Sequence, residues 1–394
     1  MINNLINGFV QAILIGIIFG VVVDRWLIPL LQRWLDRIER WRARDRYQAT
    51  QIPDPPQEFN KYRLGNIEIP VMNLMGSPLT PFSVDEVKTT YEPLVDHQQP
   101  DYPAHLSDAK PYLLEEYFRK FNIRSQHDRE VPRLVGCDQA GESQDDKRGG
   151  LTLHFALTTF HNLITTNRSL DYKVIPETGP IARFTKNQTI RTAYVKIPRS
   201  RYLDSLASSV LSNALSSSIV VISRNLYQTP KDQVLIRLRS NSVAFFRNYY
   251  QVSAAGLMST AHRDESRNLS PFITAVEEAN QEIADKLKLA SSDFKLIGIA
   301  VNWEDLDLHA YGYAETGLAV QDLLGDFRRD AYEGGVEAIS FDPKSILSHI
   351  AHNKWEPVSV LAMCAALLVF FPRTEVEKIA GTIPAKHFRE FYER

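Results

Sequence analysis

The stretch "FITAVEEANQEIADKL", residues 272–287, decides how the rest of the chain is interpreted. It is typical of a helix, and on a helix Glu278 and Glu282, which are four residues apart, share one face. Glu277 stands beside the first of them. Carboxylates on a helix face can hold a divalent cation through oxygen ligands, but they are equally common on a face turned to solvent. This helix alone leaves both interpretations open.

The segments around this helix indicate an α+β fold. Residues 151–167 predict a strand followed by a helix, and residues 200–218, "SRYLDSLASSVLSNALSSS", predict a helix with a serine-rich face. Short β-branched runs predict strands over 218–224 and 232–240, ahead of the opening helix. After it, "FKLIGIAVNWEDLDLHAYGYAET", residues 294–316, alternates as one long strand or a broken pair.

The order of these segments resembles the Nudix fold, a mixed α/β sandwich whose signature helix carries an Arg-Glu pair, a spacer and a Glu-Glu pair. Glu278 stands where the first family glutamate does, and Glu282 where the last one does. Glu277 replaces the arginine, Gln281 replaces one glutamate, and Ala284 replaces a glycine. The box is therefore degenerate, and the resemblance covers roughly residues 151–350.

The resemblance implies a nucleotide-derived ligand. In the family, glutamates on this helix hold Mg²⁺, which neutralises phosphate oxygens and orients a water for diphosphate hydrolysis. A catalytic and metal-binding role for Glu278 and Glu282 follows if the eroded box still works. A receptor needs no turnover, only cations for phosphate and flat groups for bases. The candidate ligand contacts lie in or after the preceding strand: Arg237, Arg239, Arg247, Gly256 and His262.

The N-terminus carries an uncharged, mostly aliphatic run, "LINGFVQAILIGIIFGVVV", residues 5–23. A run of about 20 residues is long enough to span a bilayer as a helix. The rival interpretation, a signal peptide, lacks both a basic segment before the run and a cleavage pattern after it. No Lys or Arg precedes the run, whereas seven arginines follow: Arg25, Arg33, Arg37, Arg40, Arg42, Arg44 and Arg46. We therefore expect a single-pass inner-membrane protein with its N-terminus outside and its main domain in the cytoplasm.

Small residues recur every four positions in this anchor, at Gly8, Ala12, Gly16 and Gly20. Such a stripe lets helix backbones approach closely in lipid, which predicts a homo-oligomer. Apolar residues continue the seam with coiled-coil spacing: Leu27, Leu31, Trp34, Ile38 and Trp41. The alternative is an amphipathic helix that lies on the anionic leaflet, and the two interpretations are compatible.

The remaining boundaries follow from composition. We predict an anchor and stalk over 1–46, a proline-rich linker over 47–58, an unassigned part over 59–150 and a Nudix-like domain with C-terminal helices over 151–394. The apolar stretch 357–371 is too short for a typical span and predicts a buried core helix. A net charge of −2 gives no indication of DNA binding, and the two cysteines suggest neither a disulfide framework nor a zinc site.

Together with the anchor, the chain resembles the SMODS-associated Nudix-like proteins of bacterial cyclic-oligonucleotide antiphage systems, of the CBASS type. That resemblance implies a receptor and effector: the cytoplasmic domain binds a cyclic nucleotide, and the clustered anchors disrupt the inner membrane. The second hypothesis is a membrane-tethered, Mg²⁺-dependent hydrolase of a nucleoside diphosphate derivative. The sequence leaves open whether the chain is an enzyme.

Overall fold

The structure is a computed structural model. It describes residues 47–91, 102–121, 127–139, 150–174, 188–195, 197, 199–224, 232–240, 243, 246–325 and 334–386, with seven further positions between 28 and 38. The predicted anchor, with Gly8, Ala12, Gly16 and Gly20, lies outside the described residues. Within the described part of the chain, no helix is both long enough and apolar enough to cross a membrane.

The main sheet contains the strands that the sequence predicts on both sides of the opening helix. Its order is β13-β8-β7-β12-β11-β3, and the short strands β10 and β9 pair with β7 and β8. Strands β7 and β12 run parallel and the other pairs are antiparallel. The bounds are β3 (Val71–Gly76), β7 (Leu215–Ser223), β8 (Gln233–Leu238), β9 (Tyr250–Gln251), β10 (Ala254–Leu257), β11 (Phe294–Asn302), β12 (Leu308–Thr316) and β13 (Gly335–Ser340).

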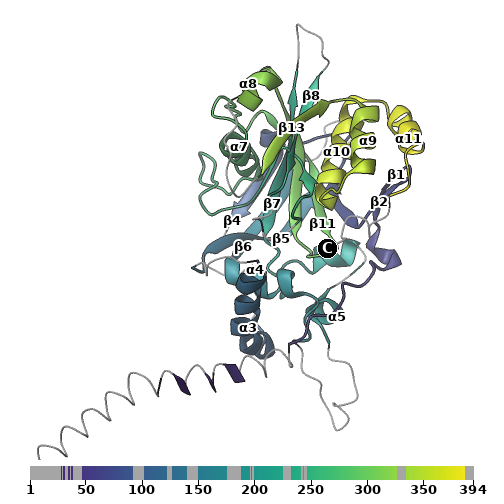
Figure 1. Ribbon diagram of the computed structural model, residues 1–394. Coiled ribbons are helices and arrows are strands. Elements are labelled where there is room, and N and C mark those ends of the chain that lie inside the picture. Colours follow the sequence, from purple (N-terminus) through teal and green to yellow (C-terminus); the bar gives the residue numbers. More distant parts are fainter. Residues whose placement is uncertain are drawn as a thin grey trace, which may run out of the picture.

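The strands alternate between two buried faces, so each face of the sheet needs a helical cover. In β7, Ile219 and Val221 belong to one core cluster, whereas Val220 and Ile222 belong to another. Helix α7 (Pro271–Glu282) packs on the first face, and α9 (Pro343–His352), α10 (Pro357–Phe370) and α11 (Arg373–Ala380) cover the second (Figure 1). This architecture confirms the predicted α+β class.

Helix α10 is the buried core helix that its apolar sequence predicts. It packs against β7, β11 and β12, and its residues from Pro357 to Leu368 are all buried. Burial raises the pKa of the Cys364 thiol to about 12, so this cysteine is an apolar core residue rather than a reactive one.

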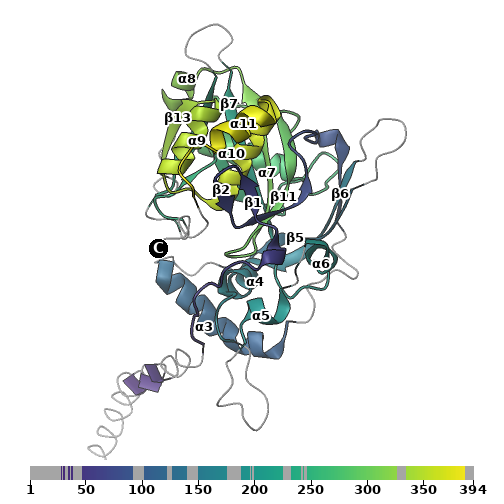
Figure 2. The same cartoon turned by 90° about the vertical axis from the view of Figure 1, so that its right-hand side faces the viewer.

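A second, smaller sheet joins the chain's N-terminal and central parts. Its order is β4-β6-β5, and helices α3 and α4 lie beside it, at the end of the molecule opposite α8 (Figure 2). Strand β3 pairs with β11, and β4 and β5 pair with β6, so residues 59–150 contribute to both sheets. The bounds are β4 (Val87–Tyr91), α3 (Ala104–Phe121), β5 (Glu130–Gln139), β6 (Leu151–Thr159), α4 (Phe160–Thr165) and α8 (Val320–Gly325).

Short elements complete the described chain. The pair β1 (Tyr62–Leu64) and β2 (Ile67–Ile69) forms a separate two-stranded sheet. Four short helices or turns connect the longer elements: η2 (Gln57–Phe59), η3 (Val84–Glu86), η4 (Asn167–Ser169) and α5 (Ile190–Tyr194).

The predicted helix over residues 200–218 was wrong from residue 205 onward. Helix α6 (Arg199–Asp204) ends early, Asn213 adopts a left-handed conformation with φ 48°, and the serine run enters strand β7. Ser217 Oγ donates to the carbonyl of Pro271 at 2.9 Å. Full-length pairing with β12 satisfies the backbone of this run, so tertiary contacts override its helical pattern.

Residues 47–53, called the strap below, run along the body of the protein although they belong to the predicted linker. Thr50 donates through both its backbone N–H (2.8 Å) and its hydroxyl (2.7 Å) to the carbonyl oxygen of Asp171. The indole N–H of Trp303 donates to the carbonyl of Pro53 at 2.7 Å. These bonds attach the strap at its middle and at its C-terminal end.

Candidate functional site

Helix α7 begins where its sequence predicts and ends earlier. Ser270 caps its N-terminus by accepting a hydrogen bond from the backbone N–H of Ile273, and Pro271 occupies the first turn. The helix ends at Glu282, whereas the sequence predicts it through residue 287. Both surviving glutamates of the box therefore lie on the helix, with Glu282 in its final position.

Glu278 lies directly on the glycine of β10. A Cβ atom added at Gly256 would stand only 2.0 Å from the Cδ and Oε1 atoms of Glu278. A side chain at position 256 would therefore displace the Glu278 carboxylate, which crosses the strand backbone at this point. Two residues that the sequence analysis proposed separately, Gly256 and Glu278, form one contact.

Glu282 contacts a buried arginine of the neighbouring strand. Nη1 of Arg237 is 3.3 Å from Oε2 of Glu282, and Nη2 donates to the Glu282 carbonyl oxygen at 2.5 Å. Arg237 is 0% exposed. It reaches α7 because β8 alternates: Leu235 belongs to the core under α7, and Arg237, two residues on, points the same way. The guanidinium therefore supplies the positive charge next to this carboxylate.

Arg239 and Arg247 have different surroundings. Nη1 of Arg239 donates to the side-chain oxygen of Gln251 at 2.5 Å. Gln251 belongs to β9, which pairs with β8. Arg247 is exposed, and its Nε donates to the carbonyl of Val243 at 2.8 Å. The Arg247 guanidinium carbon lies 5.8 Å from the ring centre of Phe121, at the end of α3. Arg247 thus belongs to the α3 side of the molecule.

His262 links the loop before α7 to the helix. Its Nδ1 accepts a hydrogen bond from the backbone N–H of Ser259 at 3.1 Å and lies 2.9 Å from the Thr274 hydroxyl. Because a backbone N–H only donates, the neutral ring carries its proton on Nε2, which lies 3.5 Å from Oε2 of Glu277. Burial lowers the pKa of His262, and Glu277 opposes that shift.

Two of the three glutamates on α7 lie next to a basic side chain. Glu282 faces the Arg237 guanidinium, Glu277 faces His262, and Gln281 carries no charge. Among the residues that the structure describes, no group of three or more His, Cys, Asp or Glu side chains could hold a metal ion. The Arg237 guanidinium thus lies beside one of the two glutamates that the sequence predicts as metal ligands.

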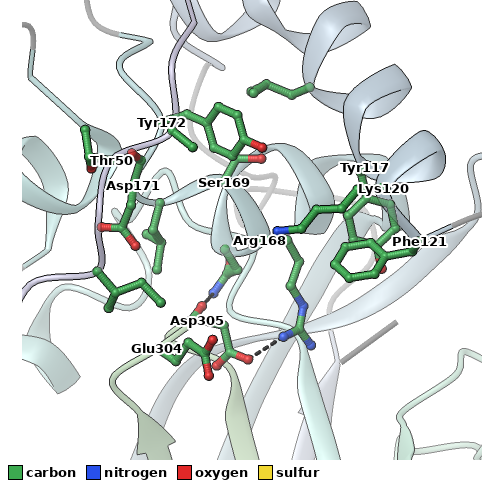
Figure 3. A pocket seen from close by; sticks show the side chains of 15 residues that line it. Thr50, Tyr117, Lys120, Phe121, Arg168, Ser169, Asp171, Tyr172, Glu304 and Asp305 are labelled. Atoms are coloured by element: carbon green, nitrogen blue, oxygen red, sulfur yellow. Dashed lines mark hydrogen bonds and ion pairs between the residues drawn. The ribbon is translucent and has the colours of Figure 1, made fainter. Parts of the chain in front are cut away.

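A pocket of about 100 Å³ lies under the strap, away from α7 (Figure 3). Four segments that are distant in sequence form its walls: the strap, the C-terminal half of α3, residues 167–172 and the turn between β11 and β12. The main lining side chains are Thr50, Tyr117, Lys120, Phe121, Arg168, Asp171, Tyr172, Glu304 and Asp305.

Ion pairs make the floor of this pocket rigid. Arg168 binds the carboxylates of both Asp305 and Asp307, and Arg191 holds Asp171 through two bonds of 2.7 and 2.8 Å. Burial disfavours the charged form of Arg168, but Asp307 and Asp305 outweigh it and raise the pKa of this arginine. Arg168 therefore joins the 167–172 segment to the turn, and Arg191 holds the same segment through Asp171.

Sequence analysis missed this pocket. Residues 59–150, which supply α3, carry no recognisable motif, and the four walls of the pocket come from segments far apart in the sequence. The only local signal is the acidic turn "EDLD", residues 304–307, between two strands. Such a turn is common on protein surfaces, so it does not by itself indicate buried ion pairs.

Comparisons with known proteins give weak neighbours only. No family model matches the chain, and no curated protein matches it. The chain resembles the crystal structure of a NUDIX hydrolase from Alicyclobacillus acidocaldarius, with 13% identity and a TM-score of 0.29, over 44% of this chain and 98% of that one. It also resembles a MutT/nudix family protein from Enterococcus faecalis, with 12% identity and a TM-score of 0.26, over 39% and 60%. At this level of overlap, neither neighbour bears on function.

Proposed function

We propose that this chain is a Nudix-like protein that binds a nucleotide derivative and does not hydrolyse it at a metal centre. The observation that carries the proposal is the pairing of buried Arg237 with Glu282, the last glutamate of the degenerate box. The nucleotide class of the ligand comes from the resemblance of the box helix and the arginine-bearing strand before it.

The charge balance at α7 supports binding over metal chemistry. A divalent cation needs several carboxylate oxygens around one open position. Adding Mg²⁺ beside the Arg237 guanidinium would bring like charges together in a buried, weakly screened place. The chain therefore retains the helix of the family without its metal chemistry.

Ligand binding and metal dependence are measured together on the full chain in detergent. The probes are ADP-ribose, UDP-glucose and cyclic di-AMP, titrated by calorimetry once with EDTA and once with Mg²⁺. We expect at least one probe to bind with the same affinity under both conditions and to be recovered intact. If none of the three binds, the proposal is overturned.

One observation favours the second candidate function, a Mg²⁺-dependent hydrolase. Glu278 is only partly buried, and its carboxylate lies on β10 at Gly256. In this case Mg²⁺ would be required for release of a nucleoside monophosphate from ADP-ribose or UDP-glucose. Glu278→Gln would abolish that activity, whereas Glu265→Gln, a change at an exposed loop position, would not. Such a result would replace the binding proposal.

The membrane role of residues 1–46 is part of the same proposal. In it, residues 5–23 anchor the chain in the inner membrane with the domain in the cytoplasm, and the small-residue stripe brings the anchors of several copies together. A ligand drives clustering only if it binds the clustered state more tightly than the resting state. Membrane disruption in antiphage defence would follow from clustering, and crosslinking with and without the bound probe tests this step.

A further inference from the structure

The pocket under the strap has flat side chains on more than one wall. Tyr117 and Phe121 lie on α3 with ring centres 5.0 Å apart and planes at 61°, and Tyr172 comes from the segment after η4 (Figure 3). Aromatic side chains of this kind are the usual stacking partners of nucleic-acid bases, because every base has a flat face.

The charges inside the pocket disfavour a phosphate there. Among the residues that the structure describes, its lining includes three carboxylates, Asp171, Glu304 and Asp305, and two cationic side chains, Arg168 on the floor and the exposed Lys120 near the end of α3. Arg168 is already engaged by carboxylates. A neutral ring with hydrogen-bond donors and acceptors on its edge suits this lining better than an anion does.

Cations gather instead around one aromatic ring of the pocket wall. Nζ of Lys120 lies 5.3 Å from the ring centre of Phe121, and the Arg247 guanidinium carbon lies 5.8 Å from it. Both of these basic residues are exposed. With positive charge at the exposed edge of a partly aromatic pocket, one ligand can stack its base inside the pocket and place its phosphate on the cations at the edge.

We propose that this pocket binds the base of a nucleotide while Lys120 and Arg247 hold its phosphate groups outside. The inference rests on the proposed function. It places the ligand site in the pocket under the strap rather than at the degenerate box. It also gives Arg247, which the sequence singles out as a ligand contact, a structural partner in α3.

This location would connect the ligand to the strap. Thr50 forms one wall and is bonded to Asp171, whereas Glu304 and Asp305 belong to the turn of the main sheet. A base in the pocket would contact both. Because the strap follows the predicted anchor and stalk, ligand occupancy would act on the segment that leads to the membrane.

The test uses the full chain and whichever probe of the earlier panel binds most tightly. Phe121→Leu keeps an apolar side chain and removes the flat ring, so we expect the affinity to fall about tenfold. The matched control is Phe118→Leu on the same helix, whose ring lies 6.2 Å from His161 and 5.7 Å from Tyr117 and does not itself line the pocket. This control should bind like the unmodified chain.

A second pair of variants separates the phosphate from the base. Lys120→Gln with Arg247→Gln changes exposed residues only, so folding is preserved, and it should weaken nucleotide binding while leaving binding of the free nucleoside unchanged. Arg119→Gln, next to Lys120 and paired with Glu116, is the control. Two results would overturn the site while the proposed function stands. One is equal affinity of the unmodified chain, Phe121→Leu and Phe118→Leu; the other is unchanged nucleotide affinity of the Lys120→Gln, Arg247→Gln double variant. Absence of binding by every probe overturns the proposed function itself.

Discussion

The guanidinium of Arg237 lies against Glu282, with Nη1 3.3 Å from Oε2, and joins strand β8 to the last residue of helix α7. A charge pair in this position stabilises a fold only while both partners are present. Removing one partner leaves the other buried without compensation, which costs far more than the pair contributes. The pair therefore constrains which substitutions the α7 face tolerates.

We predict that Arg237→Met destabilises the protein by about 3 kcal/mol, because Glu282 then keeps its charge beside an apolar side chain. Adding Glu282→Gln should recover part of that loss. Urea unfolding of the two single variants and the double variant gives the coupling energy. Strictly additive losses would show that the two residues do not interact in the folded state.

A side chain at position 256 should be less well tolerated while Glu278 is present. Gly256→Ala places a methyl group 2.0 Å from the Glu278 carboxyl group, so the glutamate must move, at a cost of about 1 kcal/mol. Glu278→Ala in the same chain should restore the thermal midpoint. Gly317→Ala is the control, since a Cβ at Gly317 meets no atom within 4 Å. A Gly256→Ala variant as stable as this control would contradict the contact.

Acid should destabilise the loop before α7 through His262. Burial lowers its pKa in the folded protein, so the unfolded chain binds the proton more readily. The stability contribution is therefore complete above the ordinary histidine pKa of about 6.5 and is lost as the pH falls from there toward the lowered folded value. Urea midpoints measured across this window should fall less for His262→Gln than for the unmodified chain.

Glu277 supplies the internal check on that pH dependence. Its carboxylate opposes the lowering of the His262 pKa, so Glu277→Gln should depress that pKa further and steepen the loss of stability in acid. An unchanged slope in the Glu277→Gln variant would mean that the 3.5 Å approach of the two side chains has no energetic consequence.

The anchor prediction is tested apart from the folded domain. Gly16→Leu with Gly20→Leu should reduce crosslinking between copies in membranes, because leucine holds helix backbones apart along the stripe. Leu14→Ala with Ile18→Ala, which changes residues off the stripe, is the control. Undiminished crosslinking of the glycine variant would remove the stripe from the proposal.

Local sequence patterns correctly predicted the elements whose pattern of apolar residues matches their burial in the fold. The uninterrupted apolar run of α10 is buried along its length, and the β-branched runs on both sides of α7 form strands. The prediction for residues 200–218 was wrong because a serine run that looks helical in isolation is paired in β7 with β12. Pairing between residues about ninety positions apart leaves no trace in local periodicity.

The sequence by itself determined the α+β class, the degenerate box and the residue types available at it, because these depend on order and spacing along the chain. Only the tertiary structure decided that Arg237 pairs with Glu282, that Glu278 lies on Gly256, and that four distant segments enclose the pocket. The physical reason is that charge pairing and close packing depend on distances across the sheet, which the chain sets only when it folds.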